Sequence, residues 1–191
     1  MITSDKMKAI CIQEGHAAAL VDHPIPQLRP TYILVKVHAV ALNPLDYKLV
    51  DFMGEADRTL GCELAGTVIE VGSDVTVAVK KGDRVMGIAH GGNTHEKDDG
   101  AFAEYALLKG DIAIPVPDWM SWTEASAFPM GAFTAALGLY QQMGLAEPGI
   151  PSQDEPETRT KVLIYGASSA TGLYCIKLAK LLVLSPCLAS D

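Results

Sequence analysis

Short runs of β-branched and apolar residues, separated by glycine and proline, fill the chain between residues 8 and 117. Three of these runs are long enough to define strands, at 32–42, 60–71 and 83–88. Runs of this composition between turn-forming residues are typical of strands that pack into a small sheet or barrel. We therefore predict a compact β-barrel domain over residues 1–120.

The pattern becomes helical at Ser121. Ser121 and Glu124 have the spacing of a capping box, in which two side chains satisfy free backbone N–H groups at the start of a helix. Apolar residues then recur every three or four positions from 131 to 143, which predicts a helix with one apolar face. The segment 147–160 contains three prolines and four acidic residues, as expected of a solvated loop. We assign 121–160 to connecting helices and this loop.

The last segment, 161–191, changes pattern again. Residues 161–165 are an apolar run after one lysine, as in a parallel strand that is buried on both faces. Small residues follow at 166–172, and apolar residues return at helical spacing over 173–182. Strand, glycine-bearing turn and helix in this order open a dinucleotide-binding domain. The predicted fold class is mixed β and α/β, a β-barrel domain followed by the first β–α unit of an incomplete Rossmann domain.

Composition narrows the classes of function. The 191 residues are 49% apolar and 20% charged, which excludes disorder and coiled coil. With 15 basic and 23 acidic residues the net charge is −8, so nucleic acid is a poor partner. No apolar run is long enough to span a membrane and the start lacks a signal layout, so we expect a soluble, cytoplasmic protein without a membrane partner. Reduced thiols are expected at Cys11, Cys62, Cys175 and Cys187, which lie far apart.

The turn at 166–172 carries chemistry suited to a nucleotide. A diphosphate must be met by free backbone N–H groups, which a glycine-bearing turn at a helix start provides. Small side chains let the backbone approach the ligand, and hydroxyls can add donors. Serines stand where the middle glycine of G-x-G-x-x-G would be, so the turn taken alone fits an ordinary β–α turn equally well. The candidate cofactor-binding residues here are Gly166, Ser168, Ser169, Ala170, Thr171 and Gly172.

Three motifs in the β-rich region resemble the GroES-like catalytic domain of the medium-chain dehydrogenases/reductases. They are Gly-Cys-Glu-Leu-Ala-Gly-Thr-Val at 61–68, Val-Gly-Ser-Asp-Val at 71–75 and Gly-Asp-Arg-Val at 82–85. Further motifs at 41–48, 100–105 and 128–135 fall in the order of that family. The resemblance extends over residues 8–180 and implies that the β-barrel domain is the GroES-like catalytic domain.

The family's catalytic zinc would need a cysteine, a histidine between Gly and Glu, and a further cysteine or acid. Asn43 stands in the first region, Cys62 replaces the histidine, and Gly-Ala at 131–132 occupies the third. One thiol does not supply the three protein ligands of a catalytic zinc, so we expect no zinc and no other metal. His90 and His95 lie in a polar loop and are expected to be solvated. The chain thus resembles the zinc-independent branch.

Within that branch, Asn-Pro-x-Asp-x-Lys at 43–48 and the turn at 166–172 look most like the fungal trans-acting enoyl reductases that serve polyketide synthases. The resemblance implies NADPH as cofactor, an α,β-unsaturated acyl thioester, free or carrier-bound, as substrate, and a polyketide synthase as a partner. It makes Lys48 the candidate for stabilising charge on the thioester oxygen, and Thr134 a candidate contact of the nicotinamide amide or ribose. A solvated lysine and a helix-packing threonine are the competing explanations. Quinone-oxidoreductase-like enzymes are the nearest alternative.

The end of the chain departs from the family pattern. A complete dinucleotide site needs several strands, and the residues after Lys180 do not resemble the expected turn and second strand. We expect a truncated chain that lacks most of the cofactor domain, including the groups that separate NADPH from NADH. The apolar strand would then lack neighbours that bury it. A catalytically inactive fragment that acts only as an interaction module is therefore a second hypothesis.

Overall fold

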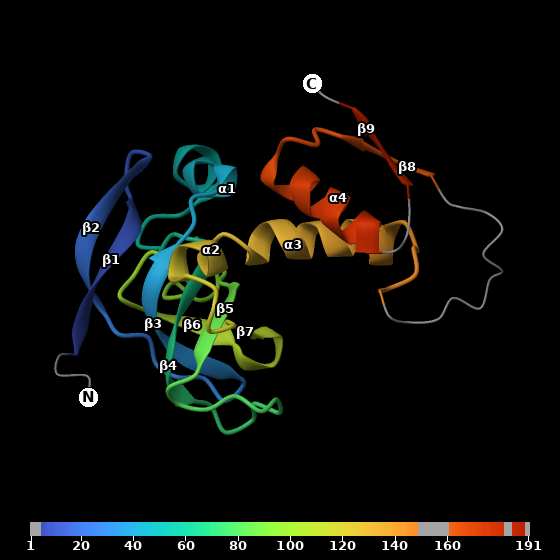
Figure 1. Ribbon diagram of the computed structural model, residues 1–191. Coiled ribbons are helices and arrows are strands. Elements are labelled where there is room, and N and C mark those ends of the chain that lie inside the picture. The colour runs from blue at the N-terminus through green and yellow to red at the C-terminus, as the bar shows by residue number, and fades with distance from the viewer. Residues whose placement is uncertain (1–4, 149–160, 182–184, 190–191) are drawn as a thin grey trace. The chain divides into compact units, whose positions relative to one another are not determined.

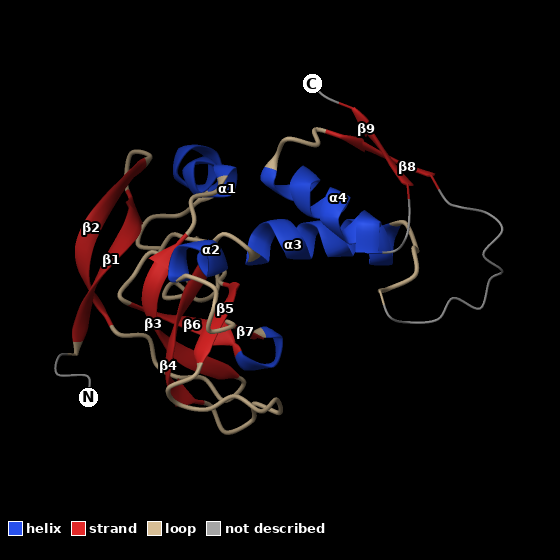
Figure 2. Cartoon of the chain, in the orientation of Figure 1, coloured by secondary structure: helices blue, strands red, loops and turns tan. Residues whose placement is uncertain are grey.

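The computed structural model describes residues 5–148, 161–181 and 185–189, and the chain divides into two compact units, Met1–Pro129 and Met130–Asp191. The first unit is built mainly of strands, which Figure 2 shows in red. In chain order these are β1 (Lys6–Gln13), β2 (Ala17–Pro24), β3 (Tyr32–Val40), β4 (Glu63–Val71), β5 (Arg84–Ile88), β6 (Tyr105–Lys109) and β7 (Ile114–Pro115). The predicted runs 32–42, 60–71 and 83–88 contain β3, β4 and β5, so the strand pattern is confirmed.

The strands form two antiparallel sheets (Figure 1). β1 and β2 make a hairpin, and the other five strands pair in the order β6-β3-β4-β5-β7. Bridges from Ala9 to Ala103 and from Cys11 to Thr59 tie the hairpin to segments that border the larger sheet. Inward residues of β3 and β4, among them Val35 and Val68, are fully buried in one apolar core. The fold class is confirmed as mixed β and α/β.

Gly66 shows why a glycine stands in the middle of β4. A Cβ atom at this position would lie 2.2 Å from the carbonyl oxygen of Lys36 on β3. No real Cβ contact is that short, so only glycine lets the two backbones approach this closely. The register between β3 and β4 also shifts twice, as at a β-bulge, which bends the paired strands.

Short helices complete the first unit: α1 (Pro44–Lys48), the π-helical turn η1 (Leu49–Met53), the 3₁₀ turn η2 (Gly110–Ile112) and α2 (Trp122–Ser126). The predicted capping box opens α2. Ser121 Oγ accepts a hydrogen bond from the backbone N–H of Glu124 (3.3 Å), and Glu124 Oε2 accepts one from the backbone N–H of Ser121 (3.0 Å). α2 buries Ala125 against Ala65 and Met86 of the sheet.

The second unit contains α3 (Pro129–Ala136), the π-helical turn η3 (Leu137–Gln142), β8 (Lys161–Tyr165), α4 (Ala170–Leu181) and β9 (Ser185–Ala189). The helix predicted over 131–143 begins two residues earlier, because proline fits the first turn of a helix. It ends before Gly144, whose φ of +66° closes the helix. Most of the predicted loop 147–160 lies outside the described residues.

Two apolar elements of this unit are only partly buried. β8 is buried on one face only, with Val162 and Ile164 inside and Leu163 and Tyr165 exposed at 69% and 76%, which fits the expectation that this strand lacks some of the neighbours that would bury it. The apolar residues of α4 differ in the same way, because Ala179 is buried whereas Leu173 is 49% exposed. An apolar run alone cannot show whether one face of a strand is covered or both.

A second strand follows α4, contrary to the expectation from the sequence. β9 pairs in parallel with β8, from Lys161 opposite Ser185 to Tyr165 opposite Ala189, so β8, α4 and β9 form one β–α–β unit. Parallel strands pair through backbone hydrogen bonds, so side-chain patterns carry little signal for this pairing. A proline such as Pro186 is tolerated in a strand that has an unpaired edge. No helix in the described part of the chain is long and apolar enough to cross a membrane.

Candidate functional site

The glycine-bearing turn in the second unit links β8 to α4, and hydrogen bonds within the turn hold its backbone in place. Gly166 has a φ of +74°, a conformation that glycine adopts without strain. The backbone N–H and the hydroxyl of Ser169 both donate to the carbonyl of Gly166, at 3.0 and 2.8 Å. Ser169 Oγ in turn accepts a hydrogen bond from the backbone N–H of Gly172 (3.1 Å). Ser169 is therefore the N-cap of α4.

Four backbone N–H groups of the turn have no acceptor among the described residues: those of Ala167, Ser168, Ala170 and Thr171. They lie at the N-terminal end of a 12-residue helix, where the peptide dipoles favour negative charge. The side chain of Ser168 is exposed and that of Thr171 is half-buried. Free amides, exposed hydroxyls and a helix terminus at one place have the chemistry of an anion site.

Gly172 brings the first turn of α4 close to the strand. A Cβ atom there would lie 2.3 Å from the carbonyl oxygen of Gly166 and 2.9 Å from the Cα of Ala167. A larger residue would push the helix away from the turn and displace the free amides. Glycine at this position is therefore a packing requirement of the turn, which the spacing of two glycines in the sequence had indicated.

Thr134 lies on α3, which packs against α4 within the same unit. A Cβ atom at Gly131 would lie 2.7 Å from the Tyr174 ring and 3.6 Å from the carbonyl carbon of Ala170, so the two helices meet closely at that glycine. Thr134 is one turn further along α3 and its side chain is exposed. Its hydroxyl is therefore available, and packing against another helix does not occupy it.

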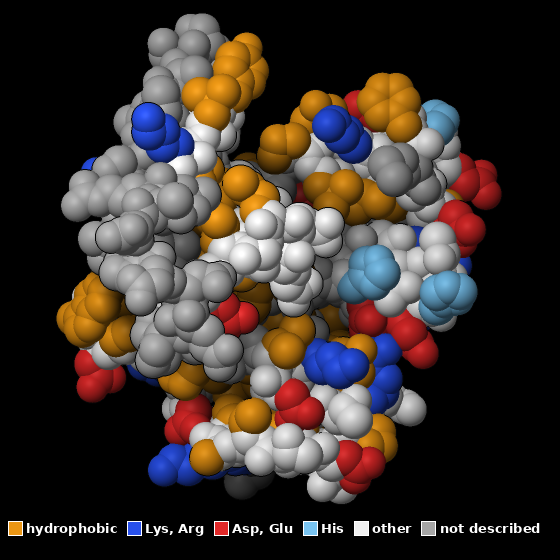
Figure 3. All heavy atoms as spheres, turned by 90° about the vertical axis from the view of Figure 1, so that its right-hand side faces the viewer, with side chains coloured by type: hydrophobic (Ala, Val, Ile, Leu, Met, Phe, Trp, Pro, Cys, Tyr) orange, Lys and Arg blue, Asp and Glu red, His pale blue; other side chains and the backbone are white. Residues whose placement is uncertain are grey.

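Lys48 ends α1 in the first unit. Its side chain is exposed and forms no hydrogen bond or ion pair with any residue that the structure describes. The same segment exposes large apolar side chains, and hydrophobic groups of this kind reach the molecular surface at several places (Figure 3). The exposed apolar residues of α1 and η1 and of the turn before them are Leu42, Leu45, Tyr47 and Phe52, at 84%, 39%, 55% and 76%. A single cation thus stands in an apolar surface.

Two buried carboxylates hold the segment that carries Lys48. Asn43 donates from its backbone N–H to Asp46 Oδ2 and from its side-chain amide to Glu63 Oε1, each at 2.7 Å. Asp46 is 7% exposed and Glu63 2%. Asp46 closes the first turn of α1, and the Asn43–Glu63 bond ties that turn to the start of β4. Buried hydrogen bonds to charged groups are among the stronger ones in proteins.

Cys62 lies next to these carboxylates and is buried. Burial, the negative charge of Asp46 and a hydrogen bond to that carboxylate raise the pKa of the Cys62 thiol to about 12. A thiol with so high a pKa is mostly protonated at neutral pH, so it is a weak nucleophile. Among the described residues no group of three His, Cys, Asp or Glu side chains is placed to hold a metal ion.

The loop between β5 and β6 contains a polar network that the sequence did not reveal. Arg29 pairs with Asp99, which also accepts a hydrogen bond from the side-chain amide of Asn93 (3.1 Å). The buried His23 lies 3.5 Å from Asp98. His95 is exposed, as predicted for the loop histidines. The partners of Asp98 and Asp99 come from segments some seventy residues earlier, so spacing along the chain carried no signal for them.

Comparisons with known proteins identify relatives of both units. Residues 29–118 match the alcohol dehydrogenase GroES-like domain. Trans-enoyl reductase TOXD of Cochliobolus carbonum is 46% identical over 175 residues, which are 91% of this chain and 58% of TOXD. The chain spans about half the length of the curated relatives it matches.

Solved structures share the same arrangement. The quinone oxidoreductase of Coxiella burnetii is 33% identical, with a TM-score of 0.71, and the match covers 96% of this chain and 56% of that one. A mycobacterial protein solved in complex with NADPH is 24% identical, with a TM-score of 0.71 over 95% of this chain and 52% of its own. Because the mycobacterial protein is only 24% identical, its similarity to this chain concerns the fold alone.

Proposed function

This chain is a homologue of the trans-enoyl reductases with an alcohol dehydrogenase GroES-like domain, and we propose that it serves NADPH-dependent reduction of an α,β-unsaturated acyl thioester. The observation that carries the proposal is the turn at 166–172. Its four free amides lie at the start of α4, in a chain whose residues 29–118 match the GroES-like domain. A polyketide synthase that supplies the thioester is the proposed partner, as the resemblance in sequence implies, and a relative of this chain is named a trans-enoyl reductase.

The turn fits the diphosphate of a dinucleotide. Amides of Ala167, Ser168, Ala170 and Thr171 would donate to phosphate oxygens, with the Ser168 and Thr171 hydroxyls as further donors. The conformation at Gly166 and the close approach at Gly172 leave no side chain over these amides. Ser169 keeps the turn in shape by capping α4, so its part in cofactor binding is to position its neighbours. We place the exposed Thr134 hydroxyl at the nicotinamide amide or ribose.

Lys48 and the apolar residues around it fit the acyl thioester. NADPH, when bound, supplies a hydride to the β-carbon of the double bond. Negative charge then develops on the thioester oxygen, and the Lys48 ammonium group stabilises it until the α-carbon takes a proton. The apolar side chains of the Lys48 segment, described above, would contact the acyl chain and keep water from it. Reduction in this scheme needs no metal.

Cofactor titration tests the proposal directly. The 191-residue chain is titrated with NADPH while the nicotinamide fluorescence is followed, and saturable binding at micromolar concentration is expected. A chain that shows no change up to millimolar NADPH would be the inactive interaction module instead. Turnover is then measured with crotonyl thioester, and a chelator in the same assay should leave the rate unchanged. Loss of the rate on chelation would contradict the metal-free scheme.

A quinone is the second candidate substrate. The quinone oxidoreductase of Coxiella burnetii shares the fold at 33% identity, so this alternative rests on a measured likeness. Quinone reduction needs hydride transfer but no protonation at an α-carbon beside a thioester. Rates with menadione and with crotonyl thioester, measured on the same preparation, separate the two. A quinone rate that exceeds the thioester rate and is insensitive to Lys48→Ala would favour the quinone.

A further inference from the structure

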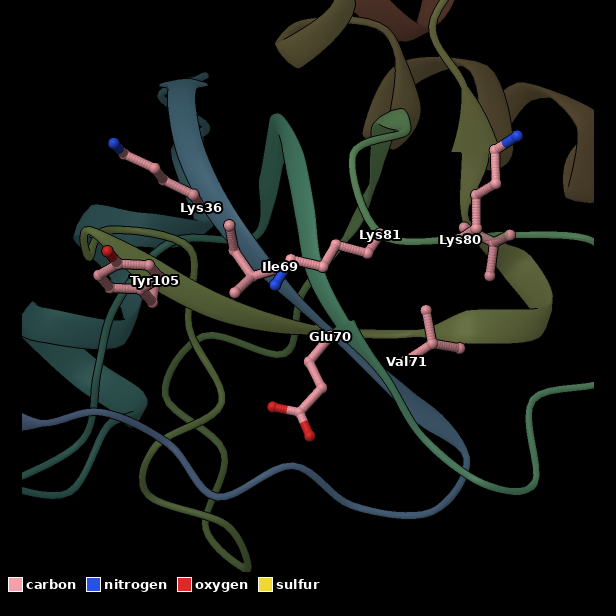
Figure 4. Close-up of a pocket in the computed structure, with 8 residues that line it drawn as sticks. Lys36, Ile69, Glu70, Val71, Lys80, Lys81 and Tyr105 are labelled. Carbon is pink, nitrogen blue, oxygen red and sulfur yellow. The ribbon is translucent and has the colours of Figure 1, made fainter. Parts of the chain in front are cut away.

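A pocket of about 840 Å³ opens in the first unit (Figure 4), and Lys48 is not among the residues that line it. It lies over β3, β4 and β6 and the turn that precedes β5. Lys36 of β3 faces it beside Tyr105 of β6, its direct partner in the sheet register. Lys80 and Lys81 enter from the turn, and Ile69 and Val71 of β4 supply apolar surface. Nothing in the proposed reductase chemistry uses these residues.

The three lysines of this basic pocket are exposed and lack carboxylate partners within the described residues. Two other lysines of the same unit do have carboxylate partners: Lys8 pairs with Asp22 at 2.8 Å and Lys97 with Asp57 at 3.1 Å. Glu70 also lines the pocket, but its carboxylate points away from the Lys36 ammonium group (Figure 4). Local charge in the pocket is therefore positive, although the whole chain carries −8.

Neighbouring groups extend the positive region across the sheet. Lys36 stands opposite Thr67 of β4, and Thr67 stands opposite Arg84 of β5. His38, two residues beyond Lys36 on β3, shows the effect of this charge. Partial burial and then the positive charges of Lys36 and Arg84 lower the pKa of His38. Burial disfavours an added charge of either sign, so only the part of the shift caused by Lys36 and Arg84 reflects a positive potential, and that potential favours an anion.

We propose that the basic pocket binds an acidic peptide segment of a partner protein. Lys36 and Lys80 lie at opposite sides of the pocket with Lys81 between them, so the ammonium groups do not converge on one point (Figure 4). That arrangement matches carboxylates spaced along a chain better than a single phosphate. Ile69 and Val71 offer contacts to the apolar parts of such a segment. The net charge of −8 on this chain opposes the approach of an acidic partner. Docking of such a partner therefore needs a surface with unpaired lysines, as in this pocket.

A peptide-binding assay on the full chain tests this proposal. The probe is a fluorescein-labelled peptide of alternating Asp and Leu, and the matched control peptide has Asn in place of Asp. Anisotropy should show saturable binding of the acidic peptide alone, weakened by salt. Replacing two ammonium groups by Lys36→Gln with Lys81→Gln should weaken binding about tenfold, as expected for a pair of partly exposed charge contacts. Lys161→Gln makes the same charge change on β8 and should leave the affinity within about twofold.

A second readout separates binding in the pocket from binding elsewhere. The pKa of His38, followed by NMR of its ring protons, should rise when the acidic peptide binds, because added negative charge favours the imidazolium form. It should also rise in Lys36→Gln without peptide. Both lysines are exposed, so the variants should unfold at the temperature of the unmodified chain.

Several outcomes would overturn the proposal. Equal affinity of the Asn peptide would show that charge is not what is recognised, and undiminished binding by the double variant would place the site elsewhere. A single-stranded oligonucleotide of equal charge that binds more tightly than the peptide would assign the pocket to nucleic acid instead. None of these results depends on reductase activity, so they leave the proposed function to its own test.

Discussion

Cys62 is a residue whose chemistry is set by its surroundings. The resemblance in sequence places Cys62 where zinc-dependent members of the family would have a histidine, and a reduced thiol without zinc is expected there. Its burial and the neighbouring Asp46 raise its pKa to about 12 and keep the proton on sulfur. A protonated, buried thiol is chemically inert under ordinary conditions.

We expect Cys62 to resist alkylation in the folded protein. Iodoacetamide at mildly alkaline pH should label Cys62 only after denaturation, as judged by mass spectrometry of the digested protein. Asp46→Asn removes the negative charge that helps to raise the Cys62 pKa, so labelling of the native variant should become faster. Rapid labelling of Cys62 in the unmodified native protein would contradict this explanation of its environment.

Lys48 carries the largest expected effect on activity. Lys48→Ala removes the cation proposed to stabilise the thioester oxygen and should lower kcat with crotonyl thioester at least about tenfold. Lys48→Arg keeps the charge and should retain part of the rate. Lys161→Ala, another exposed lysine, is the matched control and should leave the rate unchanged. A normal rate in Lys48→Ala would remove this residue from the mechanism.

At the scale of elements, the turn at 166–172 separates structural from binding serines. Ser169→Ala removes the N-cap of α4 and should lower the free energy of unfolding by about 1 kcal/mol. Ser168 makes no hydrogen bond within the described residues, so Ser168→Ala should leave stability unchanged and weaken NADPH binding only. Urea unfolding and the NADPH titration measure the two effects. If Ser169→Ala weakens NADPH binding and Ser168→Ala lowers the free energy of unfolding, then Ser169 contacts the cofactor and Ser168 stabilises the turn.

The capping box of α2 makes a prediction about pH. Hydrogen bonds from the Ser121 hydroxyl and backbone N–H lower the pKa of Glu124 below its ordinary value of 4.5. Since the folded pKa is the lower one, Glu124 stabilises the protein above the unfolded pKa, and this contribution is lost as the pH falls through the folded pKa. Urea unfolding of Glu124→Gln over the acidic range should therefore show a smaller loss of stability with falling pH than the unmodified chain. Identical slopes would mean that the box does not form in solution.

At the scale of the whole molecule, β8 is half covered. Val162 and Ile164 pack with Leu139 in the core of the second unit, whereas Leu163 and Tyr165 are exposed. In a parallel sheet with helices on both faces such residues would be buried, and an exposed apolar strand face favours self-association. The chain spans 58% and 50% of the length of two curated relatives that it matches.

We expect the outer face of β8 to control solubility. Leu163→Thr with Tyr165→Thr should reduce light scattering of the concentrated protein and change the free energy of unfolding by less than about 0.5 kcal/mol per site. Val162→Thr, on the covered face, is the matched control. It should lower the free energy of unfolding by about 1 to 3 kcal/mol, because it buries a hydroxyl without a partner. Scattering that is unchanged by the first pair would show that this face does not drive association.

Local patterns in the sequence determined the elements. Ser121 and Glu124 marked the start of α2, alternating apolar residues marked β3, β4 and β5, and the small residues after Tyr165 marked the turn into α4. Capping, strand formation and turn conformation depend on residues close together in the chain, which is why these predictions hold. The family motifs at 61–85 extended the same reasoning to the GroES-like domain.

Only the tertiary structure decided what depends on distant residues. The Asn43–Glu63 bond, the pairing of Asp99 with Arg29 and the positive region around Lys36 each join segments that are separated in the chain. The exposed face of β8 and the pairing of β9 also follow from what packs beside them. Burial and electrostatic fields are sums over neighbours in space, and the order of residues along one segment does not contain those neighbours.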